Sequence, residues 1–241
     1  MTDIPTLFDW TGNLMRGLGL TVYITVLGTV LMVIVAVVLG MLARSHRLLV
    51  RGLARTVIEF FRGTSLLIQL WWLFFALPLL GIRFDAVLVG VLALGLNYGA
   101  YGAEVVRGSI NAVPQTQWEA ATALNLHSWH RMRRIIWPQA VALMIPSMNN
   151  LFIQLLKSTP LLYTIALVDL MTMGESFRFA GGNETVMYLA LMVIYFILAY
   201  TVTFLSNLAE VVAKSRLGQH EGVRSVFSSR KPPQKLEVTA P

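Results

Sequence analysis

Five stretches of the chain each run for at least 18 residues without a charged side chain. A helix needs about 20 predominantly apolar residues to cross the hydrocarbon core of a bilayer, so each stretch approaches or exceeds the length of a span. Charged residues make up only 13% of the sequence, against about 25% in soluble domains. The sequence therefore predicts an all-α polytopic membrane protein with five transmembrane helices, over residues 17–43, 63–82, 86–103, 135–156 and 185–209.

Basic residues are distributed unevenly between the two sides of these spans. Of the 19 Lys and Arg residues, only four fall on the side of the amino terminus, namely Arg16, Arg83, Lys157 and Arg178. Cytoplasmic loops carry the excess of Lys and Arg, so we expect the amino terminus outside and the carboxyl terminus in the cytoplasm. This placement explains the formal charge of +7 without a nucleic-acid partner.

The chain is expected to have three parts. Residues 1–16 form an extracytoplasmic segment, residues 17–213 the transmembrane domain, and residues 214–241 a flexible cytoplasmic tail too polar to bury a core. Residues 158–168 are apolar but too short to cross a bilayer, which predicts a re-entrant or interfacial segment.

One cytoplasmic loop, residues 111–138, carries a helix–turn–helix pattern. Pro114 suits the first turn of a helix, and residues 119–124 are strongly helix-forming. Asn125 can take the left-handed conformation that ends a helix, and Ser128 can cap a second one. The pattern also fits a plain connecting loop with surface helices, so the residues alone leave both interpretations open.

Four motifs of the chain, in order, resemble one family. The run EAATALNLHSWHRMRRIIWP is similar to the EAA loop of ABC importer membrane subunits. FFRGTSLLIQLW, NYGAYGAEVVRGSI and QLLKSTPLLYTIALVDL resemble the polar amino acid uptake branch of that family. The resemblance as a whole covers roughly residues 8–213. The resemblance implies a type I ABC importer permease fold with a cytoplasmic coupling helix.

In that family the loop docks into a groove on a separate ATP-hydrolysing subunit. The resemblance assigns this coupling role to Glu119, Ala120, Ala121, Leu124 and Asn125. Ala120 and Ala121 would leave a low surface that a partner can approach, and Glu119 would lie early in the helix, where the dipole favours a carboxylate. The chain has no G-x-x-x-x-G-K-[ST] phosphate loop, so it is expected to be a transport subunit rather than an enzyme. It would hold no cofactor, because ATP and Mg would bind the partner.

Two positions of the loop depart from the family pattern. Asn125 replaces a glycine, and Asn tolerates the left-handed region better than most residues. Thr116 replaces a second glycine, which leaves the geometry at the start of the coupling helix open.

The resemblance also implies partners and a location. We expect a second permease subunit, forming a heterodimer or a homodimer, two ATP-binding subunits and an extracytoplasmic substrate-binding protein. The chain would lie among the lipids of the bacterial cytoplasmic (inner) membrane.

Polar residues at membrane depth are candidates for the substrate pathway. By the resemblance these are Thr64, Asn97, Tyr98, Tyr101, Lys157, Ser158 and Thr159. Each has a structural alternative. Thr64 can cap the second span, Asn97 and the two tyrosines can join helices by hydrogen bonds, and Lys157 can extend to the interface.

The substrate class follows from a missing carboxylate. Ser158 stands where amino acid permeases often have aspartate, and Pro160 replaces a serine. This argues against a cationic substrate and favours a polar amino acid or related zwitterion. The run GLNYGAYGAEVVRGSINAVP is most similar to ectoine and hydroxyectoine permeases, so an ectoine-like compatible solute is one expectation.

Two patterns in the third span predict structure rather than chemistry. Glu104 and Arg107 lie three residues apart, which favours a structural ion pair on one helical face. Gly95, Gly99 and Ala103 form a small-residue stripe that lets helices pack closely. His127 and His130 have no third ligand nearby, so a metal site is not expected.

Two function classes compete with the importer. An ATP-independent secondary transporter or channel would need no partner, but the lack of internal symmetry and of mid-membrane acids argues against it. A membrane scaffold protein would use the loop only for recruitment, and substrate would then never change the ATPase rate of the assembled complex.

Overall fold

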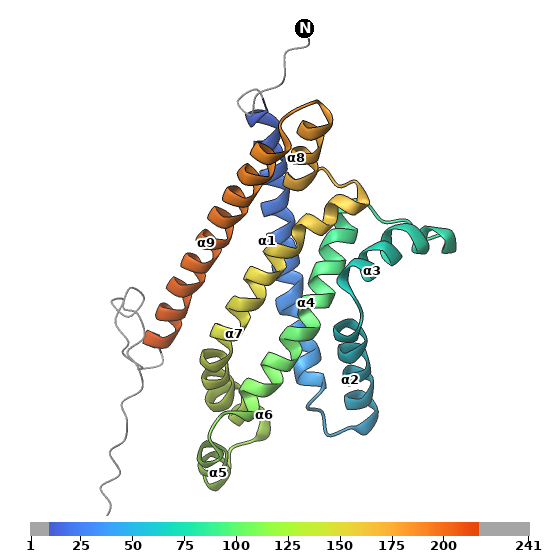
Figure 1. Cartoon of the computed structure of the whole chain (residues 1–241). Coiled ribbons are helices and arrows are strands. Elements are labelled where there is room, and N and C mark those ends of the chain that lie inside the picture. Colours follow the sequence, from blue (N-terminus) through green and yellow to red (C-terminus); the bar gives the residue numbers. More distant parts are fainter. Residues whose placement is uncertain (1–9, 217–241) are drawn as a thin grey trace, which may run out of the picture.

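The computed structural model describes residues 10–216 (Figure 1). Within this range all regular structure is helical: α1 Thr11–Leu42, α2 Leu48–Gly63, α3 Leu66–Trp71, α4 Ala86–Asn111, α5 Gln115–Ala123, α6 Ser128–Arg131, α7 Trp137–Ser158, α8 Leu170–Phe179 and α9 Glu184–Arg216. Short π and 3-10 helices join them: η1 Trp72–Ala76, η2 Leu77–Leu80, η3 Met132–Ile136 and η4 Thr159–Ile165. Most of the expected amino-terminal segment (residues 1–9) and of the tail (217–241) lies outside the described residues.

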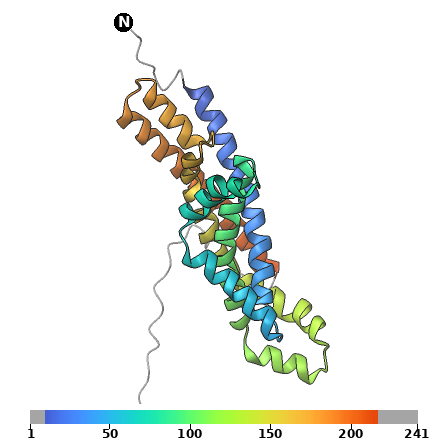
Figure 2. The ribbon, with the colours of Figure 1, turned by 90° about the vertical axis from the view of Figure 1, so that its right-hand side faces the viewer.

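The long helices run along one axis of an elongated molecule (Figures 1 and 2). Four of them, in the part of the chain described, are long and apolar enough to cross a membrane, and a bent pair supplies a fifth crossing if it counts as one span. The α5–α6 hairpin lies at one end of the molecule, and α8 lies at the other (Figure 2). The five-span expectation therefore holds with one span broken.

The second span differs from the prediction. It comprises α2 and the segment Leu66–Leu80, which meet at a bend of 102°, so the region expected to be a basic loop is helix α2. A search for charge-free runs misses α2, because its arginines occupy one face of an amphipathic helix. Ala54 and Ile58, one turn apart on the other face, are buried against Leu39 and Ala103.

Helices α1 and α4 form the centre of the molecule, and small residues let them approach closely. A Cβ atom at Gly95 would lie 2.6 Å from Leu31, and one at Gly99 would lie 2.6 Å from Val35. From the other side, a Cβ at Gly40 of α1 would lie 2.8 Å from the carbonyl oxygen of Ala103. The predicted small-residue stripe is thus confirmed as a packing surface.

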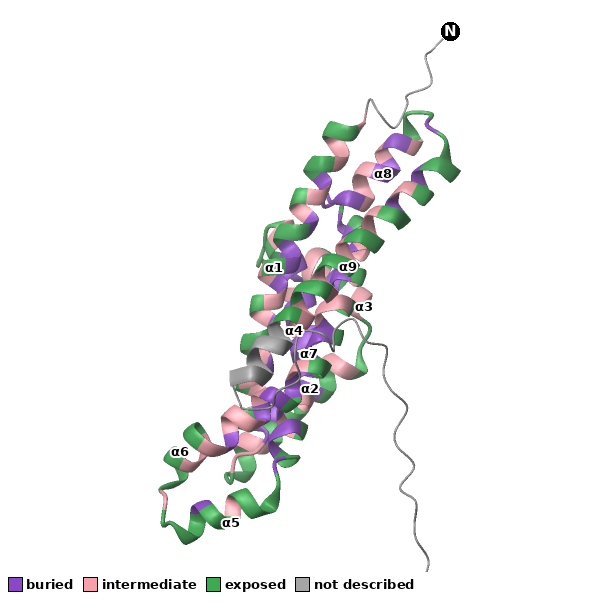
Figure 3. Cartoon of the chain, turned by 90° about the vertical axis from the view of Figure 1, so that its left-hand side faces the viewer, coloured by how far each residue is buried: buried purple, intermediate pink, exposed green. Residues whose placement is uncertain are grey.

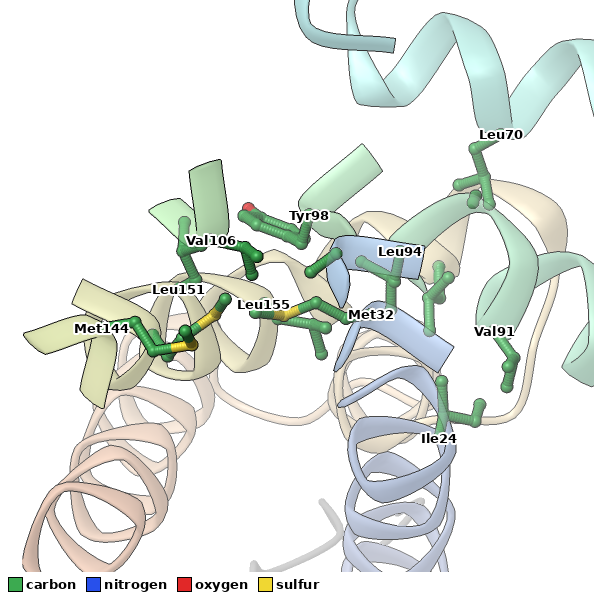
Figure 4. Close-up of a cluster of buried hydrophobic side chains, with 14 of the residues drawn as sticks. Ile24, Met32, Leu70, Val91, Leu94, Tyr98, Val106, Met144, Leu151 and Leu155 are labelled. Carbon is green, nitrogen blue, oxygen red and sulfur yellow. The ribbon is translucent and has the colours of Figure 1, made fainter. Parts of the chain in front are cut away.

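The main hydrophobic core lies where α1, α4 and α7 meet (Figure 4). Met32 of α1 packs between Leu94 of α4 and Leu155 of α7, and all three side chains are almost fully buried. Such a core fixes the three helices relative to one another. The polar helix ends and breaks around it are therefore held at defined positions.

The last part of the chain contributes η4 to this core and forms a second, smaller core where α8 and α9 meet the start of α1. After α7, the 3-10 helix η4 turns away at Ala166, whose φ is 53°. With seven residues η4 is too short to span a membrane by itself, and it continues the apolar helical run that begins at Ser128. Helix α9 contacts α7 and α8, and most of its side chains face outward.

Candidate functional site

The α5–α6 hairpin is largely exposed and lies at one end of the helical body (Figure 3). Glu119, Ala120, Leu124 and Asn125 are all exposed. Ala121 is only 1% exposed, so the expectation that both alanines face a partner is wrong, and Ala120 alone leaves a low surface there. Ala121 is buried because α5 packs against η3 on that side.

The turn of the hairpin forms as the sequence predicts. Asn125 has φ 51°, and the Leu126 amide donates to the Ala121 carbonyl at 3.1 Å, which closes the end of α5. The second helix is capped one residue early, because His127 rather than Ser128 accepts from the Trp129 amide. Thr116 lies inside α5 with ordinary helical geometry, so this position needs no glycine.

Glu119 does not lie where its dipole benefit was expected. Helix α5 begins at Gln115 and has no acidic residue in its first turn, so Glu119 occupies the middle of a nine-residue helix. Glu119 is exposed and lines an open pocket together with Arg44 and Arg131.

A second group of polar residues surrounds the break between α2 and α3. The bend leaves backbone carbonyls at the end of α2 without helical partners, and two buried side-chain amides donate hydrogen bonds to them. Gln69 Nε2 donates to the Phe61 carbonyl at 2.9 Å, and Asn97 Nδ2 donates to the same carbonyl at 3.0 Å. Gln69 also reaches Thr64 Oγ1 at 2.7 Å. This satisfies the backbone at a broken helix inside a membrane protein.

Asn97 and Gln69 are joined to each other as well. Asn97 Nδ2 lies 3.3 Å from Gln69 Oε1, and both side chains are buried. Asn97 therefore joins helices by hydrogen bonds, which was the structural alternative for this residue. Gln69 was missed by sequence reasoning, because one glutamine in an apolar run gives no sign of its partner.

The two tyrosines of α4 point to neighbouring segments. The Tyr98 hydroxyl lies 2.5 Å from Ser158 Oγ at the end of α7. The Tyr101 hydroxyl donates to the Arg62 carbonyl at 3.2 Å, and the Arg62 guanidinium lies 5.5 Å from the Tyr101 ring centre. These contacts place the candidates from α2, α4 and α7 around one region of the molecule.

The remaining pathway candidates differ in exposure. Thr64, Tyr101 and Lys157 are exposed, and Ser158 is half-buried. Thr159 is fully buried, and its hydroxyl donates to the Leu156 carbonyl at 2.8 Å.

The predicted ion pair on α4 is present. Arg107 Nη2 lies 2.6 Å from Glu104 Oε2, and Arg107 Nε lies 3.0 Å from the same oxygen. A two-point contact between neighbours on one helix face stabilises the helix rather than supplying a reactive group.

The far end of the molecule holds a buried acid that the sequence analysis did not single out. Asp169 caps α8 by accepting from the Thr172 amide at 2.9 Å, and its side chain is fully buried. Burial raises the pKa of the Asp169 carboxyl, although hydrogen bonds from Thr172 act in the opposite direction. Within residues 10–216, no cluster of three or more His, Asp and Glu residues could hold a metal ion.

Comparison with known proteins decides what this arrangement belongs to. Residues 33–211 match the family described as binding-protein-dependent transport system inner membrane component. The chain belongs to this family. The permease is 42% identical over 208 residues to a probable amino-acid ABC transporter permease protein of Sinorhizobium fredii, covering 84% of this chain and 87% of that one.

A second relative and a solved structure resemble the chain over most of its length. The permease is 29% identical over 215 residues to an L-cystine transport system permease protein of Bacillus subtilis, covering 86% of this chain and 90% of that one. A crystal structure of an amino acid ABC transporter with histidines superposes with a TM-score of 0.80 at 30% identity, covering 87% and 98% of the two chains. The permease therefore has the type I ABC importer fold and is a multi-pass transport subunit of the inner membrane.

Proposed function

We propose that this subunit imports a polar amino acid or a related zwitterion, with ectoine-like solutes in that class, and that a separate ATPase drives the transport through the α5–α6 hairpin. The observation that carries the proposal is the hairpin itself, which exposes Glu119, Ala120, Leu124 and Asn125 at one end of the bundle. Family membership favours this function over a secondary transporter, a channel or a scaffold.

The assembly needs partners to complete it. A second permease subunit would pair with this one, two ATP-binding subunits would bind ATP and Mg beneath the hairpins, and a substrate-binding protein would deliver solute from outside. The basic residues beyond α1, on α2 and on the hairpin support a cytoplasmic location for the hairpin end. The amino terminus would then lie outside and the carboxyl terminus inside.

The chemistry of the pathway supports a zwitterionic substrate. Lys157 offers an exposed cation for a carboxylate, and Thr64, Tyr101 and Ser158 offer hydroxyl groups. The half-buried Ser158 supplies no negative charge beside them, so a cationic side chain would have no counter-ion at this position. Asn97 and Thr159 would support the pathway from within the protein.

The test is Glu119→Lys in the complete transporter reconstituted in proteoliposomes. Reversing this exposed charge should leave the subunit inserted but abolish substrate uptake or loosen the ATPase, because the ATPase would meet a cation where it binds a carboxylate. Glu119→Gln, which removes this charge without reversing it, is the matched variant and should impair uptake less. Normal uptake by Glu119→Lys would count decisively against the proposed coupling role.

A further inference from the structure

One aromatic ring joins the hairpin to the end of α1. Trp118 of α5 is half-buried, and two guanidinium groups lie against its ring. The Arg44 guanidinium lies 5.8 Å from the ring centre, and that of Arg131 lies 5.6 Å from it. Arg44 follows α1 by two residues, whereas Arg131 ends α6. The ring therefore lies where the first membrane span meets both arms of the hairpin.

Hydrogen bonds hold both guanidinium groups in place. Arg131 Nη1 donates to Thr122 Oγ1 at 2.8 Å, and the same hydroxyl donates to the Trp118 carbonyl at 2.8 Å. Arg44 Nη1 donates to Asn111 Oδ1 at the end of α4. A guanidinium held over an indole ring is attracted by about 0.5–2 kcal/mol, depending on how far it is desolvated.

The Arg44 group is also partly removed from water. Burial lowers the pKa of Arg44, and the positive charge of Arg107 lowers it further. A cation in this situation benefits more from an aromatic face than a fully hydrated one does. The Trp118 ring thus stabilises the Arg44 guanidinium, which is partly desolvated at the end of α1.

A cavity of about 620 Å³ separates α5 from the bundle beside this contact. Its walls include Arg44, Asn111, Gln115, Trp118, Thr122 and Arg131. Because the space next to the ring is hollow, α5 meets the end of α1 through a discrete contact rather than a packed interface. The Trp118 ring, which also packs against the main core, is thus the direct contact through which a displacement of α5 would reach the end of α1.

Helix α1 continues without a break for 32 residues, about 48 Å at the usual rise per residue. Near its other end, Thr21 Oγ1 accepts from the Leu170 amide at 3.1 Å, and a Cβ at Gly17 would lie 2.8 Å from the Asp169 carbonyl oxygen. Asp169 and Leu170 lie shortly after η4, the 3-10 helix that begins at Thr159. One rigid helix therefore connects the hairpin contact to the opposite end of the molecule.

We propose that Arg44, Trp118 and Arg131 form a clamp through which movement of the coupling hairpin is transmitted to α1. Trp118 and Arg44 are positioning residues for transport, since they act through α1 and touch neither substrate nor nucleotide. This inference rests on the proposed function, because it takes α5 as the element that the ATPase moves.

The test compares variants that keep or remove each half of the clamp, in the complete transporter in proteoliposomes. Trp118→Leu and Arg44→Met should lower substrate imported per ATP hydrolysed about fivefold, the equivalent of losing about 1 kcal/mol of cation–aromatic attraction. Trp118→Phe keeps an aromatic ring and Arg44→Lys keeps a cation. Both variants should therefore retain most of the wild-type import per ATP hydrolysed. Arg47→Met, at an exposed arginine three residues after Arg44, is the matched control.

A crosslink gives a second, independent readout. The chain contains no cysteine, so Arg44→Cys with Trp118→Cys introduces a unique pair. The double variant should be uncoupled when reduced, and a short bismaleimide that joins the pair should restore import per ATP.

Each contrary result has a definite meaning. A wild-type ratio in Trp118→Leu and Arg44→Met, with Glu119→Lys uncoupled, would overturn the clamp and leave the proposed function standing. Loss of ATPase co-purification in those variants would overturn it in favour of a docking role, and loss of membrane insertion would overturn it in favour of a purely stabilising one. Normal uptake by Glu119→Lys would instead remove the proposed function itself.

Discussion

The Tyr98 hydroxyl lies 2.5 Å from Ser158 Oγ, so the middle of α4 is hydrogen-bonded to the last residue of α7. Tyr98 is 9% exposed, whereas Ser158 is half-buried and lies beside the exposed Lys157. The bond fixes the direction of a hydroxyl in the proposed pathway from inside the protein.

Tyr98→Phe keeps the ring and removes this bond. A hydrogen bond of this kind contributes about 1 kcal/mol, so the apparent KM of uptake should rise about fivefold while the protein remains folded. Uptake kinetics in proteoliposomes measure the change, with Tyr23→Phe on the exposed face of α1 as the control. An unaltered KM in Tyr98→Phe would show that Ser158 needs no orienting partner.

The amides at the break in the second span should act as one unit. Asn97→Leu or Gln69→Leu leaves the other amide and the Phe61 carbonyl short of partners, which should lower the free energy of unfolding by about 1–3 kcal/mol. The double variant should lose less than the sum of the two single losses, because the shared bond can be broken only once. Unfolding in mixed detergent micelles measures all three, and strict additivity would contradict the network.

The approach of α1 to α4 makes another prediction. Gly40→Ala places a methyl group 2.8 Å from a backbone oxygen of α4, and backbone cannot yield cheaply, so we expect a loss of about 1–3 kcal/mol in the free energy of unfolding. Gly19→Ala is the matched control in the same helix, because nothing lies within 4 Å of its added methyl group. That variant should be neutral or gain at most about 1 kcal/mol. Equal stability of the two variants would refute the close contact.

The buried Asp169 makes stability depend on pH. Its pKa is raised above the ordinary value of 3.8, so the folded protein holds this proton more tightly than the unfolded chain does. Protonation of Asp169 therefore adds to the free energy of unfolding. This contribution is fully present below the ordinary pKa of the carboxyl and is lost as the pH rises through its raised pKa in the folded protein. Asp169→Asn keeps the oxygen that caps α8 and should flatten this part of the profile of unfolding free energy against pH. An identical profile in the variant would assign the dependence to other groups.

Much of the architecture follows from hydropathy, because a lipid-facing helix must be continuously apolar. The spans beginning near Thr11, Ala86 and Glu184 are therefore recognisable in the sequence, and the turn at Asn125 follows from the local preference of one residue. Helix α2 was not recognised, since its arginines interrupt the apolar run while its buried face needs only Ala54 and Ile58.

The candidate site was harder to predict, because its contacts join distant parts of the chain. Asn97 could be recognised as polar at membrane depth, but its partner Gln69 lies 28 residues away and its role depends on the bend between α2 and α3. The pairing of Glu104 with Arg107 was accessible, since helical spacing alone brings them together. The inward orientation of Ala121 depends on where η3 packs, which no local pattern encodes.

The outward-facing surface of α9 has a consequence for handling the protein. Only 6% of the residues in its apolar window are buried in the described part of the chain, so surrounding lipid, or a neighbouring subunit, supplies most of the contacts of its outward face. A short-chain detergent that replaces those lipids poorly will release α9 before it disturbs the glycine-lined pairing of α1 with α4. Purification in lipid nanodiscs will therefore preserve the complete five-span arrangement.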